Sequence, residues 1–255
     1  MALAACTART QSAGVEIFPT AHVLPSNLLR VYVYFPRPMK GAGILDNMHL
    51  LNASGQVVSG AFLKNKYDLW SPDRRRLTVL LDPARVKTGL AAHQTLGRAL
   101  TEGATYTVKV SGAALDRSGC ALGADTAHTF SVGPPDLDPP TPEVWALDVP
   151  RTGGRGPLTI NLGDPHDHVS LAYRLRVMRD DGTVLPGAIA LLDGERQWQF
   201  VPRMPWADGP YEVFVDPRLE DLAGNRPGQL FDRPVGDAST DRTTTLPFRP
   251  GLPSR

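Results

Sequence analysis

The stretches Tyr106-Thr107-Val108-Lys109-Val110 and Tyr211-Glu212-Val213-Phe214-Val215 decide the fold, because each places a large apolar residue at every second position. A period of two is that of a β-strand, in which successive side chains point to opposite faces. Each stretch follows a turn that contains glycine, where a tyrosine hydroxyl can bond to nearby backbone. We therefore expect two half-buried strands that each begin with a tyrosine corner.

Other short segments share this alternation, are rich in β-branched or aromatic residues, and are bounded by Gly, Pro, Asp or Asn. They are residues 31–35, 77–81, 158–162 and 171–178. Long amphipathic helical spacing is nearly absent, and residues 83–103 predict a long loop with one helical turn. Short strands at regular intervals between turn signals predict an all-β sandwich.

The sequence contains two copies of one unit. Residues 31–60 correspond to 158–187 at an offset of 127, and residues 106–119 correspond to 211–224 at an offset of 105. The offsets differ by 22 residues, which is the size of the 83–103 loop. One insertion in the first copy therefore explains both registers.

Three motifs lie around these strands. Phe35-Pro36-Arg37-Pro38-Met39 fits Phe-x-x-Pro-Met, residues 100–108 fit Leu-x-x-Gly-x-x-Tyr-x-Val, and Asp221-Leu222-Ala223-Gly224-Asn225 fits Asp-x-x-Gly-Asn. Together they resemble the SbsA-type bacterial Ig-like domain of envelope proteins, over most of residues 27–132 and more weakly over 157–248. The resemblance implies an exported Ig-like module and implies no chemistry.

The expected fold is all-β, with two tandem Ig-like β-sandwich domains joined by a Pro-rich linker. The segments are a tether at 1–14, domain 1 at 15–133 with the loop insertion 83–103, the linker at 134–144, domain 2 at 145–249, and a disordered tail at 250–255. Five prolines within residues 134–142 favour a stiff spacer.

Each copy carries an aspartate turn that sets strand register. The residues assigned to these turns are Asp116 and Gly119 in the first copy and Asp221, Gly224 and Asn225 in the second. Aspartate accepts backbone N–H bonds across such a turn, and glycine and asparagine tolerate positive φ. Cys120 stands where the second copy has Asn225, and we expect it to be an unpaired thiol, with an intermolecular disulfide as the alternative.

Leu3-Ala4-Ala5-Cys6 fits the bacterial lipobox, in which small residues precede the cysteine that becomes lipidated. Only five residues precede Cys6, so the chain would carry only the end of an export signal; a chance match in an alanine-rich segment is the alternative. Lipid on Cys6 would anchor the protein to a membrane without spanning it. We expect an exported protein of the periplasm or cell surface.

Composition argues against nucleic acid as a partner, because 27 Lys and Arg balance 26 Asp and Glu at 42% hydrophobic residues. No Gly-x-Ser-x-Gly, His-Glu-x-x-His or phosphate-binding glycine loop is present, so we expect no enzyme and no cofactor. The acidic pairs Asp164/Asp167 and Asp216/Glu220 are of a kind expected by chance in such a chain. The expected role is that of a spacer, scaffold or adhesion module, a monomer whose partners are other envelope proteins or surface glycans.

A ligand-binding module is the alternative. His166 and His168 would point the same way on an extended chain, so with Asp164 they could bind a divalent metal ion, although a polar turn explains them as well. Trp70 and Trp206 lie near turns and could stack on a carbohydrate, although packing at strand ends explains them as well.

Overall fold

The computed structural model describes residues 6, 14–64, 68–86, 97–232 and 243–251. The chain divides into unit 1, residues 1–18 and 22–134, and unit 2, residues 19–21 and 135–255. Most of the expected tether, the middle of the expected insertion (87–96) and the end of the expected tail (252–255) lie outside the described residues.

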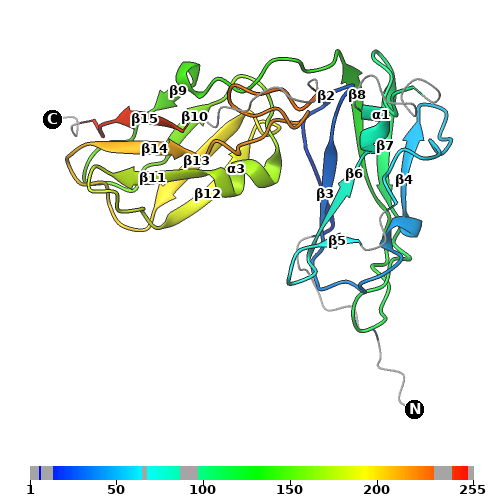
Figure 1. The fold of residues 1–255 in the computed structure, drawn as a ribbon. Coiled ribbons are helices and arrows are strands. Elements are labelled where there is room, and N and C mark those ends of the chain that lie inside the picture. The colour runs from blue at the N-terminus through cyan, green and yellow to red at the C-terminus, as the bar shows by residue number, and fades with distance from the viewer. Residues whose placement is uncertain (1–5, 7–13, 65–67, 87–96, 233–242, 252–255) are drawn as a thin grey trace. The chain divides into compact units, whose positions relative to one another are not determined.

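Unit 1 consists of two four-stranded sheets (Figure 1). One has the order β1-β3-β6-β5 and the other β2-β8-β7-β4, and all neighbours are antiparallel except β2 and β8. The strands are β1 (Glu16–Phe18), β2 (Val23–Pro25), β3 (Arg30–Tyr34), β4 (Met48–Asn52), β5 (Leu69–Trp70), β6 (Arg76–Leu80), β7 (Thr105–Val110) and β8 (Thr126–Gly133). The helical turns are η1 (Ile44–Asn47) and α1 (Pro83–Val86).

Unit 2 has a sheet of order β12-β13-β10-β9 and a second of order β11-β14-β15, both antiparallel. The strands are β9 (Ala146–Asp148), β10 (Leu158–Asn161), β11 (Leu175–Arg179), β12 (Gly187–Leu192), β13 (Gln197–Pro202), β14 (Tyr211–Val215) and β15 (Thr244–Phe248). The helices are η2 (Pro142–Val144) and α3 (His168–Arg174).

Both units follow the strand order of an immunoglobulin sandwich, A-B-E-D in one sheet and C-F-G in the other. In unit 1 these are β1, β3, β6, β5 and β4, β7, β8, with β2 added beside β8; in unit 2 they are β9, β10, β13, β12 and β11, β14, β15. The chain is therefore all-β with two tandem Ig-like sandwiches, which confirms the expected fold class.

The strand expected over residues 171–178 is wrong in its first half, where α3 runs from His168 to Arg174 before β11 begins. Asp167 caps this helix by accepting the N–H of Ser170 at 2.8 Å. Apolar residues in this short segment fit a helix turn as well as a strand, and the cap decides between them.

Residues 135–144, most of the expected linker, belong to unit 2 rather than forming a free spacer. The carbonyl of Asp136 accepts a bond from Asn225 Nδ2 at 3.3 Å, and Pro142 at the start of η2 is buried.

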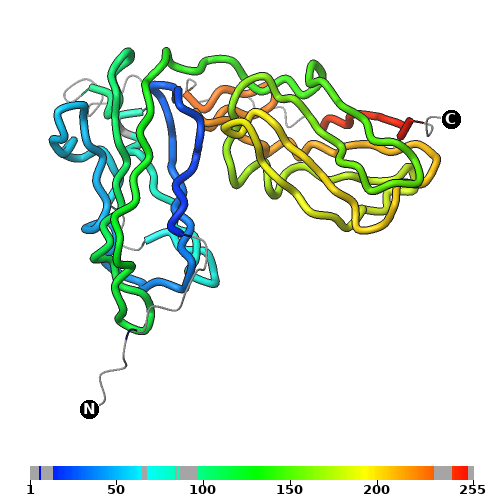
Figure 2. The backbone as a smooth tube through the Cα atoms, turned by 180° about the vertical axis from the view of Figure 1, so that it is seen from behind, coloured from blue at the N-terminus to red at the C-terminus, as the bar shows by residue number. Residues whose placement is uncertain are grey.

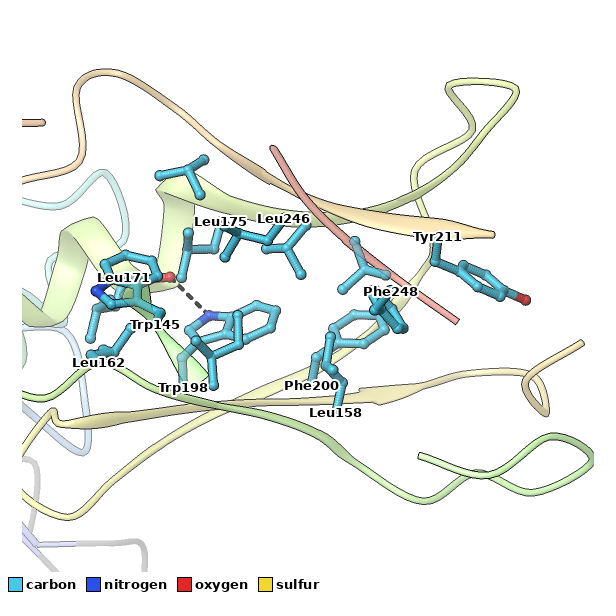
Figure 3. Close-up of a cluster of buried hydrophobic side chains, with 14 of the residues drawn as sticks. Trp145, Leu158, Leu162, Leu171, Leu175, Trp198, Phe200, Tyr211, Leu246 and Phe248 are labelled. Atoms are coloured by element: carbon cyan, nitrogen blue, oxygen red, sulfur yellow. Dashed lines mark hydrogen bonds between the residues drawn. The ribbon is translucent and has the colours of Figure 1, made fainter. Parts of the chain in front are cut away.

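The core of unit 2 lies between its two sheets (Figure 3). Trp198 is fully buried, and its indole N–H donates to the carbonyl of Leu171 at 3.1 Å. Leu158 and Ile160 from one sheet and Val213 from the other are also fully buried. Burying each aliphatic side chain contributes about 1.5–3 kcal/mol, so these alternate positions supply much of the stability.

Both expected tyrosine corners are confirmed. The Tyr106 hydroxyl accepts the N–H of Thr101 at 3.2 Å, and the Tyr211 hydroxyl accepts the N–H of Ala207 at 3.1 Å. The Tyr211 hydroxyl also donates to the Ala207 carbonyl at 3.4 Å. Each corner ties the start of a central strand to the turn before it.

We predict that Tyr211→Phe lowers the free energy of unfolding of unit 2 by about 1 kcal/mol, because a net hydrogen bond contributes about 0.5–1.5 kcal/mol. Urea denaturation followed by tryptophan fluorescence measures this. Tyr106→Phe is the matched variant and should lower the stability of unit 1 by a similar amount. If neither midpoint moves, the hydroxyl bonds do not hold the corners.

Candidate functional site

Unit 1 contains a tight aspartate turn at residues 116–120, here called the Asp116 turn. Asp116 Oδ1 accepts the backbone N–H groups of Ser118 at 2.8 Å and Cys120 at 2.9 Å. Gly119 has φ 83°, a left-handed conformation that glycine adopts without a steric cost.

Unit 2 contains the equivalent Asp221 turn, residues 221–225. Asp221 Oδ1 accepts the N–H groups of Ala223 at 2.8 Å and Asn225 at 2.9 Å, and Gly224 has φ 82°. Each aspartate also forms an antiparallel bridge to an equivalent residue, Asp116 to Met39 and Asp221 to His166. The two turns therefore share one geometry, and any special chemistry comes from what surrounds them.

In the Asp116 turn, the carboxylate of Asp116 pairs with a cation and Cys120 forms a covalent link to a distant residue. Arg37 Nε lies 2.7 Å from Asp116 Oδ2, and the Cys120 sulfur forms a disulfide with Cys6 across 114 residues of sequence. The expectation that Cys120 is an unpaired thiol is therefore wrong. The sequence contains only these two cysteines, an even number, but their pairing depended on a fold that brings residue 6 to this turn.

The disulfide bears directly on the expected lipidation of Cys6. A sulfur bonded to Cys120 has no valence left for a lipid thioether, so Cys6 holds one or the other. Lipidation of Cys6 remains a prediction of the sequence, and the disulfide is the state that the structure holds.

The Asp221 turn lacks both partners. Asp164 stands where unit 1 has Arg37, and Asn225 stands where unit 1 has Cys120. Asp221 is only 3% exposed, and its Oδ2 has no hydrogen-bond partner among the described residues. Burial raises the pKa of Asp221 to about 8, and the neighbouring carboxylate of Asp136 acts in the same direction.

His166 is a buried side chain of the same region. Its Nδ1 lies 2.8 Å from the Asp164 carbonyl oxygen, and its ring meets Trp145 edge-on at a centroid distance of 5.4 Å. Burial lowers the pKa of His166 below its ordinary value of 6.5, so the ring is neutral at pH 7.

His168 points to a different partner, Glu195, whose Oε1 lies 3.3 Å from His168 Nδ1. Glu195 is 2% exposed and also accepts the backbone N–H and the hydroxyl of Thr20, at 2.7 and 3.0 Å. Glu195 follows Asp193 and Gly194, and all three have positive φ (50°, 60° and 62°). These hydrogen bonds hold the turn in its strained conformation.

The structure thus separates the residues of the predicted metal site. The extended chain ends between the two histidines: His166 forms a bridge to Asp221, whereas Asp167 caps α3 and His168 is the first helical residue. The third residue of the predicted site, Asp164, is exposed. Among the described residues no three His, Cys, Asp or Glu side chains gather to hold a metal ion.

The two candidate carbohydrate-stacking residues are packed against other rings. Trp206 is 2% exposed, donates to the Gly156 carbonyl at 2.7 Å, and contacts Phe248 edge-on at 5.8 Å, so it offers no face to a sugar. Trp70 is half-buried against Phe35 in unit 1, at a centroid distance of 5.5 Å. A platform that includes Trp206 is therefore not formed.

The acidic pairs are each engaged separately. Asp216 binds Arg218 and Arg174, at 2.8 and 3.2 Å, and the Arg218 hydrogen bond holds the pKa of Asp216 well below its usual range. Glu220 binds Arg226 at 2.7 Å, and Asp167 caps α3. Asp216 therefore does not carry the raised pKa that a general acid needs.

A hollow in unit 1 lies between β5 and β6. Its cavity volume is about 10 Å³, no more than a single water molecule needs, and it is lined mainly by aliphatic side chains, with Asp68 and Thr78 as its polar members. Small-molecule sites usually measure about 300–1,000 Å³ and place several polar groups around the ligand. This hollow therefore has neither the size nor the polar lining of a typical substrate site.

No family model matches this chain, and no curated protein sequence matches it. Among solved structures, part of the α-2-macroglobulin of Escherichia coli spanning domains MG0-NIE-MG1 aligns at a TM-score of 0.30 and 11% identity, covering 80% of this chain and 67% of that one. The titin domains Z1Z2 in complex with telethonin align at 0.24 and 14%, covering 96% and 100%. The Ig-like fold stated above rests on this chain's own strand order.

Glu195 is a structural residue that no motif in the sequence marks. Its partners are Thr20 and His168, which are 175 and 27 residues away in the sequence. No local pattern links such positions.

None of the helices in the described part of the chain has the length and apolar composition that a membrane span requires.

We predict that Asp221 makes the protein less stable as pH rises. The folded protein binds this proton up to about pH 8, whereas the unfolded carboxyl loses it near 3.8, so the contribution of Asp221 falls between those values. The slope approaches about 1.4 kcal/mol per pH unit at most. Asp221→Asn keeps the acceptor oxygen and carries no charge, so the decline should flatten. Urea unfolding at several pH values measures it.

Asp116→Asn is the control for this prediction. It breaks the ion pair with Arg37 and should lower stability at neutral pH without removing the decline that Asp221 causes. If Asp221→Asn leaves the decline between about pH 4 and 8 unchanged, Asp221 is not the group that titrates.

Proposed function

We propose that this protein is a non-enzymatic module of the bacterial cell envelope, a spacer, scaffold or adhesion element of the SbsA-type Ig-like family. The observation that carries the proposal is that both units devote their chemically versatile side chains to their own folds. Tyr106 and Tyr211 hold corners, Asp116 and Asp221 hold turns, and His166 is buried in unit 2. Arg37 pairs with the buried Asp116, and Arg174 and Arg218 pair with the buried Asp216.

The duplicated motifs support the family assignment. The residues of Phe-x-x-Pro-Met lead from β3 toward the Asp116 turn, and Met39 at its end is fully buried and bridges to Asp116. The residues of Asp-x-x-Gly-Asn form the Asp221 turn. Each motif therefore serves the end of a sandwich, which agrees with a module whose family pattern is structural.

The Cys6–Cys120 disulfide supports export. Disulfides persist in oxidising compartments such as the bacterial periplasm and cell surface, and they are rare in the bacterial cytosol. Location at the periplasm or cell surface, with other envelope proteins or surface glycans as partners, is part of the proposal. A membrane contact would be made only through lipid on Cys6, in molecules without the disulfide.

We predict that the protein isolated from its native host without reductant gives one peptide that links Cys6 to Cys120. Non-reducing peptide mapping by mass spectrometry measures this, and Cys120→Ser is the matched variant that leaves Cys6 free. Labelling with a fatty acid should then appear, if at all, only on chains that lack the link. Cys6 found as a free thiol in the wild type would remove this support for export.

The location is tested in intact cells that produce the full chain with a C-terminal tag. External protease should remove the tag from intact cells for a surface protein, or after outer-membrane permeabilisation for a periplasmic one. Removal only after complete lysis would contradict the envelope assignment.

The ligand-binding alternative makes a distinct prediction. Calorimetric titration of the full chain with Zn²⁺ and with a glycan panel should give no saturable heat. Any saturable signal that His166→Ala with His168→Ala or Trp70→Ala abolishes, in a variant that remains folded, would replace the scaffold role with a binding role.

A further inference from the structure

Strand β12 is an unprotected sheet edge. Its sequence, Gly187-Ala188-Ile189-Ala190-Leu191-Leu192, contains no charged residue and no proline. It pairs only with β13 in its sheet, and every residue except Leu191 is exposed; Ile189 is 40% and Leu192 41% exposed. The strand follows the lower margin of unit 2 in Figures 1 and 2. A long apolar edge of this kind is a template for pairing with another chain.

The other edge strands of the two units are protected. β1, β2, β5 and β9 have three residues or fewer, and β15 carries Pro247. β4 and β11 are covered by the chain that follows them, through the bonds from Val58 N to Leu50 O and from Leu185 N to Val177 O, both 2.8 Å. These are ordinary ways of blocking edge pairing, and within the described residues β12 has none of these three features.

The register shows which backbone groups of β12 are free. Gly187 lies opposite Pro202, which has no N–H, and Arg203 N donates to Pro186 O at 2.8 Å. Bonded and non-bonded pairs alternate along an antiparallel ladder, so even-numbered residues bond to β13. The N–H and C=O groups of residues 187, 189 and 191 therefore face away from the sheet. Helix α3 lies beside the strand, but no hydrogen bond within the described residues joins the two.

We propose that two copies of this chain pair through β12, antiparallel and about a two-fold axis at Ile189. In this register Ile189 of one copy lies opposite Ile189 of the other. Gly187 of each copy lies opposite Leu191 of the other. All three outward positions then form bonded pairs with outward positions of the partner. The pairing replaces the monomer expected from the sequence and does not depend on the location of the protein.

Charge favours a second copy as the occupant. Like charges directly opposite each other normally oppose the pairing of a strand with itself, and β12 has none. The nearest acidic side chain, Asp193, is placed four residues from the axis. Two copies of Asp193 would lie about 26 Å apart along the strands, at about 3.3 Å per residue. An isologous contact of this size is small, so the dimer should be weak and concentration-dependent.

The close approach of Phe200 explains why residue 187 is glycine. A Cβ at Gly187 would lie 2.4 Å from the Phe200 ring, so the strand starts flush against the core. Leu191 also packs on the core, which directs the side chains of Ala188, Ala190 and Leu192 to the opposite, solvent-facing side. Substitution at Ala188 and Ala190 therefore changes the edge without disturbing the interior.

The test is analytical ultracentrifugation of the full chain from about 10 µM to about 1 mM. The wild type should dimerise over this range. Ala188→Lys with Ala190→Lys places like charges opposite each other across the axis and should weaken the dimer about tenfold. Ala188→Glu with Ala190→Glu should do the same, and an equimolar mixture of the two variants should regain dimer formation. Hydrogen exchange should slow with concentration at residues 187, 189 and 191 and not at 188, 190 or 192.

Val57→Lys with Val23→Lys is the control, because it adds the same charge at residues that are 54% and 51% exposed on protected edges of unit 1, away from β12. It should dimerise as the wild type does, and circular dichroism should show that all variants are folded. A wild type that stays monomeric throughout the range overturns the proposal. So does a dimer that survives the lysine pair at β12, because its interface then lies elsewhere.

Discussion

The structure depends on the burial of alternate side chains from two facing sheets. In each unit the central strands supply the deepest positions, Val33 and Val108 in unit 1 and Ile160 and Val213 in unit 2. The facing sides of the sheets are apolar, but the backbone of each strand is polar. The buried N–H and C=O groups at the ends of these strands therefore need hydrogen-bond partners within the protein. The tyrosine corners and the aspartate turns perform this task, which is why the two copies retain them.

The two aspartate turns show how one geometry tolerates different surroundings. In unit 1 the carboxylate of Asp116 meets Arg37, and the disulfide from Cys120 reinforces the turn. In unit 2 the position of Arg37 holds Asp164, so Asp221 is buried without a cation and keeps its proton to about pH 8. A raised pKa often marks a catalytic acid, but here Asp221 is 3% exposed and both of the bonds to its Oδ1 come from its own turn. The raised pKa follows from the burial of the carboxyl group, and the nearby carboxylate of Asp136 adds to it.

The surface of the protein also reflects how its side chains are engaged. His166, His168, Asp216 and Trp206, which the sequence offered as ligand-binding or acidic groups, are engaged within the fold, and the proposed pairing uses the backbone of a sheet edge instead. The backbone remains available at β12, which among the edge strands of the described residues is the one that is long, carries no charge or proline, and has no segment hydrogen-bonded along its outer side. An Ig-like module that assembles through a sheet edge needs no pocket, and its specificity comes from register and from the absence of repulsion.

The sequence by itself determined the repeat, the strand class and the tyrosine corners, because these depend on residue spacing along the chain. Val31 and Leu158 occupy equivalent buried positions, as their offset indicated. Only the tertiary structure decided which distant residues meet: Cys6 with Cys120, Glu195 with Thr20, and Asp221 with no cation. It also separated His166 from His168, since the cap at Asp167 starts a helix between two positions that an extended chain would have aligned. Such contacts join segments up to 175 residues apart, and no local periodicity encodes them.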